Sequence, residues 1–287
     1  MTATPARGTT LADERETLNV LYYGAPGVGK TVAAAHMAKL GKVIFVDAEK
    51  GLKARPLRAL GVDVARINVR HTATYAALEA LSRELHEALE AGPQAVAGVV
   101  LDSLSEIQRY VLEGDVRGLF HVTQADYGTN TMEMRALIRR FRDLPCHTVF
   151  TAHVRRDEDA DTGLVRYGPS LTPAVGGDLL AYVDIACYVH MQSRADSDEP
   201  DYVGEFRPIG RHVAKDRFGA LPPRLVNPTF DRILAYVDGT FRREAQREAD
   251  SSDNAEAVEG LDVEQFHYRQ RLMAAKAAAR PNKEAQS

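Results

Sequence analysis

The segment Gly24 to Thr31 reads Gly-Ala-Pro-Gly-Val-Gly-Lys-Thr and stands between the apolar run Val20 to Tyr23 and an alanine-rich helical stretch. This spelling in a strand, loop and helix context is that of a Walker A loop, in which backbone N–H groups surround phosphates. Lys30 would reach the β and γ oxygens, and the Thr31 hydroxyl would ligate Mg²⁺. The loop therefore predicts binding of ATP with Mg²⁺ by Gly24, Ala25, Pro26, Gly27, Val28, Gly29, Lys30 and Thr31.

Composition bounds the class of protein. With 287 residues, 45% of them hydrophobic, the chain can bury a sizeable core. We expect a flexible segment over 1–17, one α/β core over 18–240, and a charged, flexible tail over 241–287 in which a short helix is one option. The net charge of −4 gives no overall basic field, so contacts with nucleic acid must come from local patches.

The location expected from the sequence is the cytoplasm. The two cysteines, Cys146 and Cys187, are far apart and too few for a disulfide framework or a four-cysteine zinc site, which fits a reducing compartment. No apolar run approaches the length of a membrane span, and the first residues lack the hydrophobic stretch of a signal peptide. We therefore expect no membrane partner.

Apolar runs and helical periodicities alternate along the chain. Strands are predicted over 19–23, 42–49, 96–101 and 147–152, and helices over 30–40, 72–90 and around Met134 to Phe141. This order predicts an open, mostly parallel sheet with helices on both faces. Two antiparallel strands, 182–191 and 202–207, are expected to follow, and the polar segment 154–178 is interpreted as a functional loop.

A second motif is typical of the same class. Val99-Val100-Leu101-Asp102-Ser103 is a Walker B pattern, in which apolar residues bury the strand and Asp102 holds Mg²⁺ directly or through water. The strand over 147–152 leads into His153, which is placed at the same sheet edge as Asp102. His153 could sense the γ-phosphate, or it could be an ordinary core histidine with satisfied hydrogen bonds.

Hydrolysis also needs a group that orients water. Asp47 and Glu49 lie on one face of the second predicted strand by two-residue alternation, and either carboxylate could do this.

These residues resemble the RecA/RadA recombinase superfamily, whose Walker A loop is followed by a strand that ends Asp-Ala-Glu. The resemblance implies that Glu49 activates water and that Asp47 is structural. It extends over about residues 18 to 235, and Leu60-Gly61-Val62-Asp63-Val64 also looks like the segment found there. It implies a RecA-like P-loop ATPase core with antiparallel strands at the C-terminal edge.

A fourth motif sharpens the resemblance. Lys215-Asp216-Arg217-Phe218-Gly219 is similar to the Lys-Asn-Arg-Phe-Gly signature of RadA-type proteins, whose lysine and arginine act on a neighbouring subunit's nucleotide. Two cations offset by two residues could neutralise transition-state charge on a triphosphate, which would require a ring or filament. A solvated basic turn is the alternative.

The chain also departs from the cellular RadA proteins, because it has no cysteine cluster and carries His153 where RecA has a sensor glutamine. What remains looks like the minimal RecA-like single-strand annealing proteins of bacteriophages, including Asp126-Tyr127-Gly128 and Thr151-Ala152-His153. This resemblance implies DNA recombination by annealing or strand exchange, often with a single-stranded-DNA-binding protein, and the host cytoplasm as location.

The resemblance also implies that two loops hold single-stranded DNA, at about 114–130 and 154–178. The second carries Arg155, Arg156, Arg166 and Tyr167, cations for phosphates and a ring for base stacking, and Gly176-Gly177 would give mobility. Acidic residues among them leave a solvated lid as the alternative.

Three functions are weighed. The main hypothesis is a DNA-stimulated ATPase that anneals or exchanges DNA strands. The second is a nucleotide-switched assembly ATPase or helicase loader that acts on a protein partner. The third, a small-molecule kinase, is weakened because no acceptor pocket with paired arginines is evident.

Overall fold

The computed structural model describes residues 16–92, 96–115, 123–158, 162–193 and 200–240. The chain divides into two units, Met1–Gly239 and Thr240–Ser287. The predicted tail over 241–287 and most of the segment over 1–17 lie outside the described residues. The fold described below is that of the first unit.

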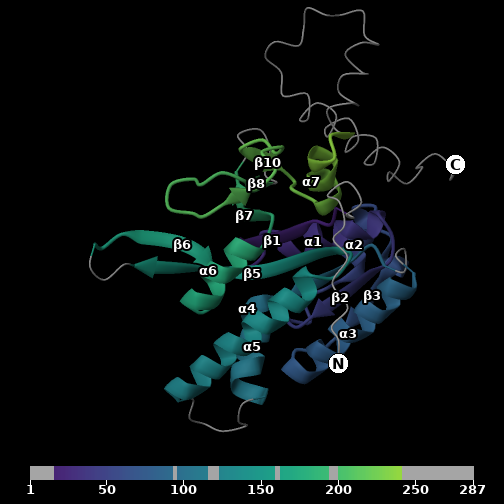
Figure 1. Cartoon of the computed structure of the whole chain (residues 1–287). Helices are drawn as coiled ribbons and strands as arrows, with labels where there is room; N and C mark the ends of the chain where they lie inside the picture. Colours follow the sequence, from purple (N-terminus) through teal and green to yellow (C-terminus); the bar gives the residue numbers. More distant parts are fainter. Residues whose placement is uncertain (1–15, 93–95, 116–122, 159–161, 194–199, 241–287) are drawn as a thin grey trace, which may run out of the picture. The chain divides into compact units, whose positions relative to one another are not determined.

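Six parallel strands form the centre of the sheet, in the order β7-β1-β5-β4-β2-β3 (Figure 1). Their bounds are β1 Asn19–Gly24, β2 Val43–Asp47, β3 Ile67–Arg70, β4 Gly98–Asp102, β5 His147–Glu158 and β7 Ile185–Gln192. Antiparallel strands continue the sheet beyond β7, namely β8 Asp201–Glu205, β9 Lys215–Asp216 and β10 Arg224–Val226. The predicted α/β fold with antiparallel edge strands is confirmed.

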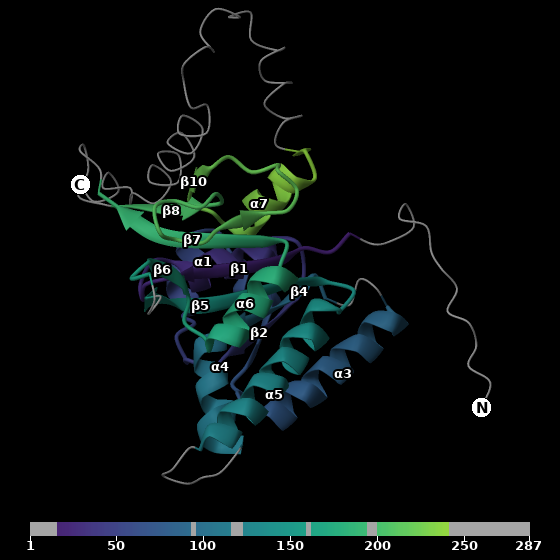
Figure 2. The same ribbon diagram turned by 60° about the vertical axis from the view of Figure 1, so that its left-hand side comes forward.

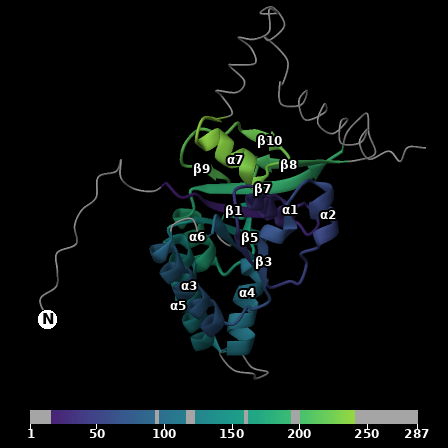
Figure 3. The ribbon, with the colours of Figure 1, turned by 90° about the vertical axis from the view of Figure 1, so that its right-hand side faces the viewer.

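Helices cover both faces of the sheet. One face carries α3 Tyr75–Ala91, α4 Leu104–Tyr110, α5 Gln124–Arg142 and α6 Pro173–Tyr182 (Figure 2). Away from them, α1 Lys30–Ala35, the 3₁₀ turn His36–Lys39, α2 Ala54–Ala59 and α7 Phe230–Val237 pack on the other face (Figure 3). A further turn of 3₁₀ helix covers Val64–Arg66, and a π-helical turn covers Val111–Asp115.

Alternation along β1 explains this two-sided core. Leu21 and Tyr23 pack with the α3, α4 and α5 side, whereas Val20 and Tyr22 pack with the α1 and α7 side. Successive side chains of a strand point to opposite faces, so a central strand buried on both faces has a continuous apolar run. All of β1 is buried, as its sequence predicts.

Local sequence signals set where the two long helices begin. The Thr74 hydroxyl accepts a hydrogen bond from the N–H of Ala77 at the start of α3. A capping box joins Thr123 to Asp126 at the start of α5, where each side chain accepts a bond from the other residue's N–H. Asp126, part of the Asp-Tyr-Gly feature quoted above, therefore has a structural role in this fold.

The prediction of a long polar loop over 154–178 was wrong. β5 continues to Glu158 and pairs with β6, Val165–Pro169, in an antiparallel hairpin, and α6 then begins at Pro173. The first part of β5 is buried and has the apolar pattern from which a strand was predicted. The part in the hairpin is more exposed and carries charged residues, so it lacks that pattern. Gly176 is buried in α6, which does not fit its expected role in a mobile segment.

Among the described residues, no helix is long and apolar enough to cross a membrane.

The packing of α3 is open to a stability test. Leu85 is 4% exposed in the core, whereas Leu60 is 47% exposed. We expect Leu85→Ala to lower the free energy of unfolding by about 2–5 kcal/mol, because it removes a buried side chain and leaves a cavity. Leu60→Ala should change it by less than about 1 kcal/mol. Urea unfolding followed by circular dichroism measures both, and equal losses would contradict the described packing.

Candidate nucleotide-binding site

The glycines of the Walker A loop are required by its backbone. Gly27 and Gly29 have φ of +80° and +87°, the left-handed region that favours glycine. A Cβ at Gly24 would lie 2.2 Å from the carbonyl oxygen of Val189 in β7, so only glycine allows β7 to approach this closely. The loop connects β1 to α1, and no side chain caps the first turn of α1. Its geometry fits the phosphate-binding role that the sequence predicts.

The Lys30 ammonium lies within the loop. Lys30 is 7% exposed, and its Nζ donates to the carbonyl oxygens of Gly24 at 3.1 Å and Ala25 at 2.8 Å. Burial lowers the pKa of Lys30, while the nearby carboxylates of Asp102 and Glu49 act in the opposite direction. A lysine held by carbonyl oxygens of its own loop can exchange these acceptors for phosphate oxygens.

Asp102 ends β4 and is the buried acid of the site. Its Oδ2 accepts a hydrogen bond from the Thr31 hydroxyl at 2.7 Å, and its Oδ1 accepts one from the Thr151 hydroxyl of β5. Burial raises the pKa of Asp102, and the two threonine hydrogen bonds oppose this. The structure thus brings together Thr31 and Asp102, the oxygen donors predicted for Mg²⁺, and this donor set fits the ion's preference for oxygen.

Glu49 and His153 form a pair next to this acid. His153 Nε2 lies 2.9 Å from Glu49 Oε1, which also accepts a hydrogen bond from the Ser103 hydroxyl. The hydrogen bond from His153 is the main cause that lowers the pKa of Glu49 to about 2, with Ser103 adding to it against the effect of burial. Glu49 therefore stabilises the fold fully above its ordinary pKa of 4.5, and this contribution is lost as the pH falls towards 2.

Asp47, the other candidate for orienting water, has a different environment. It is 2% exposed, and its carboxylate accepts hydrogen bonds from the backbone N–H groups of Gly51 at 2.9 Å and Leu52 at 3.1 Å. These bonds hold the turn after β2. The geometry therefore favours Glu49 as the residue available to a water molecule and gives Asp47 a structural role.

Lys215 and Arg217 do not join this group. Lys215 lies beside Ala186 in the register of the sheet, and the backbone N–H of Arg217 donates to the carbonyl oxygen of Asp184 at 3.0 Å. Both positions are at the amino end of β1, far from Gly24 at its other end. Lys215 Nζ donates to the carbonyl oxygens of Leu180, Ala181 and Val183, at 2.9, 3.3 and 2.7 Å.

These carbonyl groups end α6, and a helix C-terminus attracts cations. Arg217 donates to the Asp184 carboxylate at 2.7 Å and to the carbonyl oxygen of Ala181 at 3.1 Å. Both cations therefore have structural partners within their own subunit. Asp216 between them accepts hydrogen bonds from the N–H groups of Phe218, Gly219 and Leu221, which fixes the turn.

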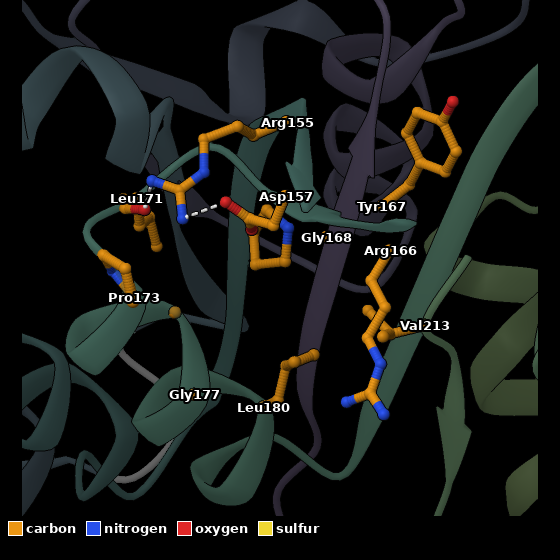
Figure 4. Close-up of a pocket in the computed structure, with 12 residues that line it drawn as sticks. Arg155, Asp157, Arg166, Tyr167, Gly168, Leu171, Pro173, Gly177, Leu180 and Val213 are labelled. Carbon is orange, nitrogen blue, oxygen red and sulfur yellow. Dashed lines mark hydrogen bonds and ion pairs between the residues drawn. The ribbon is translucent and has the colours of Figure 1, made fainter. Parts of the chain in front are cut away.

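The four residues expected to contact DNA lie on the β5–β6 hairpin, beside a hollow that α6 helps to line (Figure 4). Arg155 contacts the Asp157 carboxylate at 2.7 Å and the carbonyl oxygen of Leu171 at 2.5 Å, so it is committed to the fold. Arg156 pairs with Glu158 at 2.6 Å. Arg166 is exposed and makes no ion pair with a described residue.

One face of the Tyr167 ring is already covered. His212 stacks on it with ring centroids 4.7 Å apart, and Tyr188 stacks on His212 at 3.8 Å. The backbone N–H of Tyr167 donates to the carbonyl oxygen of Arg211, which places a second exposed arginine beside Arg166. Arg211 also has no ion pair among the described residues. The sequence reasoning missed Arg211 and His212, because the contact between 209–213 and β6 has no local signal.

Thr151 and Ser103 belong to the sequence motifs, but their contacts with Asp102 and Glu49 were not predicted. Two-residue alternation on β5 puts Thr151 on the same side as His153, so the pattern contained a signal for it.

Comparison with known proteins places this site in a family. A family model described as an AAA domain matches residues 16–218, which include the Walker A loop, Glu49, Asp102 and His153. No curated protein matches the chain. Among solved structures, it is similar to a KaiC-like protein from the hyperthermophilic archaeon Pyrococcus horikoshii OT3. That similarity has a TM-score of 0.40 and 16% identity, and it covers 66% of this chain and 78% of that chain. Because the family model spans well over half of the chain, the protein belongs to the AAA domain family of P-loop ATPases.

Proposed function

We propose that this protein is a RecA-like ATPase that acts on single-stranded DNA, in annealing or strand exchange, as an oligomer. The observation that supports it most is the continuity of β5. This strand contributes Thr151 and His153 to the nucleotide site and then continues to Arg156 and Glu158 of the exposed hairpin. A ligand on the hairpin would act on the same strand as the groups that contact Asp102 and Glu49.

Hydrolysis needs a water molecule that is positioned against the terminal phosphate. The Glu49 carboxylate is 35% exposed, ionised at neutral pH, and held in one orientation by His153 and Ser103. Its low pKa makes it a weak base, so its role is to orient water more than to remove a proton early. Lys30 would neutralise phosphate charge. Thr31 and Asp102 would hold Mg²⁺, which when bound with ATP would supply positive charge to offset the charge on the phosphates.

Binding to DNA would rest on the outer part of the hairpin. Arg166 and Arg211 are exposed and make no ion pair with a described residue, which makes them the best candidates for phosphate contacts. Tyr167 retains one ring face for a base, because His212 covers the other. A single-stranded-DNA-binding protein is a further partner that the resemblance to phage annealing proteins suggests.

A second function has its own support. Asp157 and Glu158 neutralise Arg155 and Arg156, which weakens the hairpin as a surface for a polyanion. A hairpin with paired charges suits a protein partner as well, so the alternative is a nucleotide-switched assembly ATPase or helicase loader. Turnover that responds to a protein partner and not to DNA would favour this alternative.

Replacement of Glu49 tests the hydrolytic role. We expect Glu49→Gln to lower kcat for ATP at least about 100-fold, because a neutral amide lacks the negative charge and the second acceptor oxygen that orient the attacking water. ATP binding by calorimetry should persist, whereas Lys30→Ala should weaken it. Glu84→Gln, on an exposed carboxylate of α3, is the matched control. Unchanged turnover in Glu49→Gln would contradict the assignment.

Stimulation of hydrolysis by single-stranded DNA tests the proposed substrate. We expect wild-type turnover to rise with DNA at low salt, and Arg166→Ala with Arg211→Ala to reduce this rise. If each arginine contacts one phosphate, the salt dependence of DNA binding should lose about 0.7 in slope per arginine. The control removes two exposed arginines elsewhere, by Arg83→Ala with Arg139→Ala. If the control variant loses as much of the DNA stimulation as the hairpin variant, the assignment of Arg166 and Arg211 is contradicted. If DNA has no effect on wild-type turnover, the DNA function is contradicted.

Mixed variants test whether Arg217 acts on a neighbouring subunit. If it does, Arg217→Ala should lower kcat about 10³-fold or more while ATP still binds. A mixture with Lys30→Ala should regain part of the turnover, because each variant supplies what the other lacks. Since Arg217 also holds Asp184, thermal unfolding and Arg217→Lys must accompany the assay. A mixture as inactive as its components would leave Arg217 with its structural role alone.

A further inference from the structure

Two strands border the Walker A loop on the side opposite Asp102 and Glu49. In the sheet, β5, β4 and β2 lie on one side of β1 and bring His153, Asp102 and the turn with Glu49 to the site. β7 and β8 lie on the other side of β1. This second side contacts the loop at two points.

Both contacts are at glycines. Gly24 packs against the carbonyl oxygen of Val189 in β7, as described above. Gly29, which precedes α1, packs against a ring, because a Cβ at Gly29 would lie 3.2, 3.6 and 3.7 Å from Cδ1, Cε1 and Cγ of Tyr202. Tyr202 is the second residue of β8, so a residue distant in sequence borders the Walker A loop.

Tyr202 lies on the α1 face of the sheet. A Cβ at Gly204, two residues further along β8, would meet Cys187, which belongs to the core on the α1 side. Residues two apart share a face, so the Tyr202 side chain lies on that face too. Its strand partner is Met191 of β7. Tyr202 is 38% exposed and Met191 is 48% exposed. The aromatic ring and the thioether are therefore neighbours that are both accessible to solvent next to the Walker A loop.

We infer that Tyr202 is the platform on which the nucleobase of the bound nucleotide stacks, with Met191 at its edge. This inference rests on the proposed binding of ATP. In a Walker A loop the backbone cradles the α and β phosphates, and the lysine reaches the β and γ phosphates. Asp102 and Glu49 mark the γ end, so the nucleoside leaves on the other side, towards Gly29 and β8.

The chemistry of the two side chains suits a nucleobase. Aromatic rings and polarisable sulfur both pack well on a flat π-system. The Tyr202 ring is partly exposed, so a base can stack on it without displacing another side chain. The position also restrains Tyr202, because the backbone N–H of Asn227 donates to its carbonyl oxygen at 2.6 Å. Stacking accepts any base, so this platform contributes affinity and orientation.

Affinities for ligands with and without a base test the inference. We expect Tyr202→Ala to raise the Kd for ATP and ADP about ten-fold, and Tyr202→Phe to change it by less than about two-fold, because the ring and not the hydroxyl is needed. Inorganic tripolyphosphate, which has the phosphates alone, should bind both variants like the wild type. Tyr110→Ala removes a ring that is 44% exposed on α4 and should have no effect.

A fluorescence experiment gives a second readout. The chain contains no tryptophan, so Tyr202→Trp introduces a single reporter. We expect ATP and ADP to quench its emission and tripolyphosphate to leave it unchanged, and neither to affect Tyr110→Trp. Equal ATP affinity of Tyr202→Ala and wild type, or equal loss of tripolyphosphate binding, would overturn the inference. A wild-type protein that binds no ATP would instead overturn the proposed function.

Discussion

The Asp102 carboxylate is buried at the end of β4, where a charge is costly unless it has hydrogen-bond partners. It receives one hydroxyl from Thr31 at the start of α1 and another from Thr151 in β5. Three elements that are distant in sequence thus meet at one acid. Because each partner belongs to a different element, the position of the phosphate loop depends on the alignment of β1, β5 and β4. The rest of the site is arranged around this junction.

Much of this arrangement could be predicted from the sequence, because its signals are local. The Walker A glycines specify their own backbone, and the apolar runs of β1 and β4 identify strands buried on both faces. His153 was predicted as a site residue because it stands at the carboxyl end of a predicted strand. Glu49 shares that position with Asp47, and the resemblance to the RecA/RadA superfamily chose between the two carboxylates. The contact between Glu49 and His153 was not predicted, because β2 and β5 are separated by β4, and only the register of the sheet brings their ends together.

The parts that could not be predicted depend on contacts between distant segments. The β5–β6 hairpin was taken for a loop because an exposed strand needs no apolar pattern. Lys215 and Arg217 were interpreted as cations that act on a neighbouring subunit's nucleotide, with a solvated basic turn as the alternative. Their contacts within the subunit, with carbonyl oxygens at the end of α6 and with the Asp184 carboxylate, were not predicted. A sequence shows that two cations are two residues apart, but it does not show which helix ends beside them.

β5 and β7 give the site two different kinds of connection to its surroundings. From Thr151 to Glu158, β5 is one continuous strand, so a force on the hairpin acts directly on the partners of Asp102 and Glu49. On the other side of β1, the Tyr188 ring stacks with His212, which in turn stacks on Tyr167 of the hairpin. Tyr188 also contacts Tyr23, the residue before Gly24, with ring centroids 5.4 Å apart. The hairpin therefore reaches both ends of the nucleotide site, the γ end through the backbone of β5 and the Gly24 end through a column of rings. We propose that these two connections couple a ligand on the hairpin to a nucleotide in the loop, so that each changes the other's affinity.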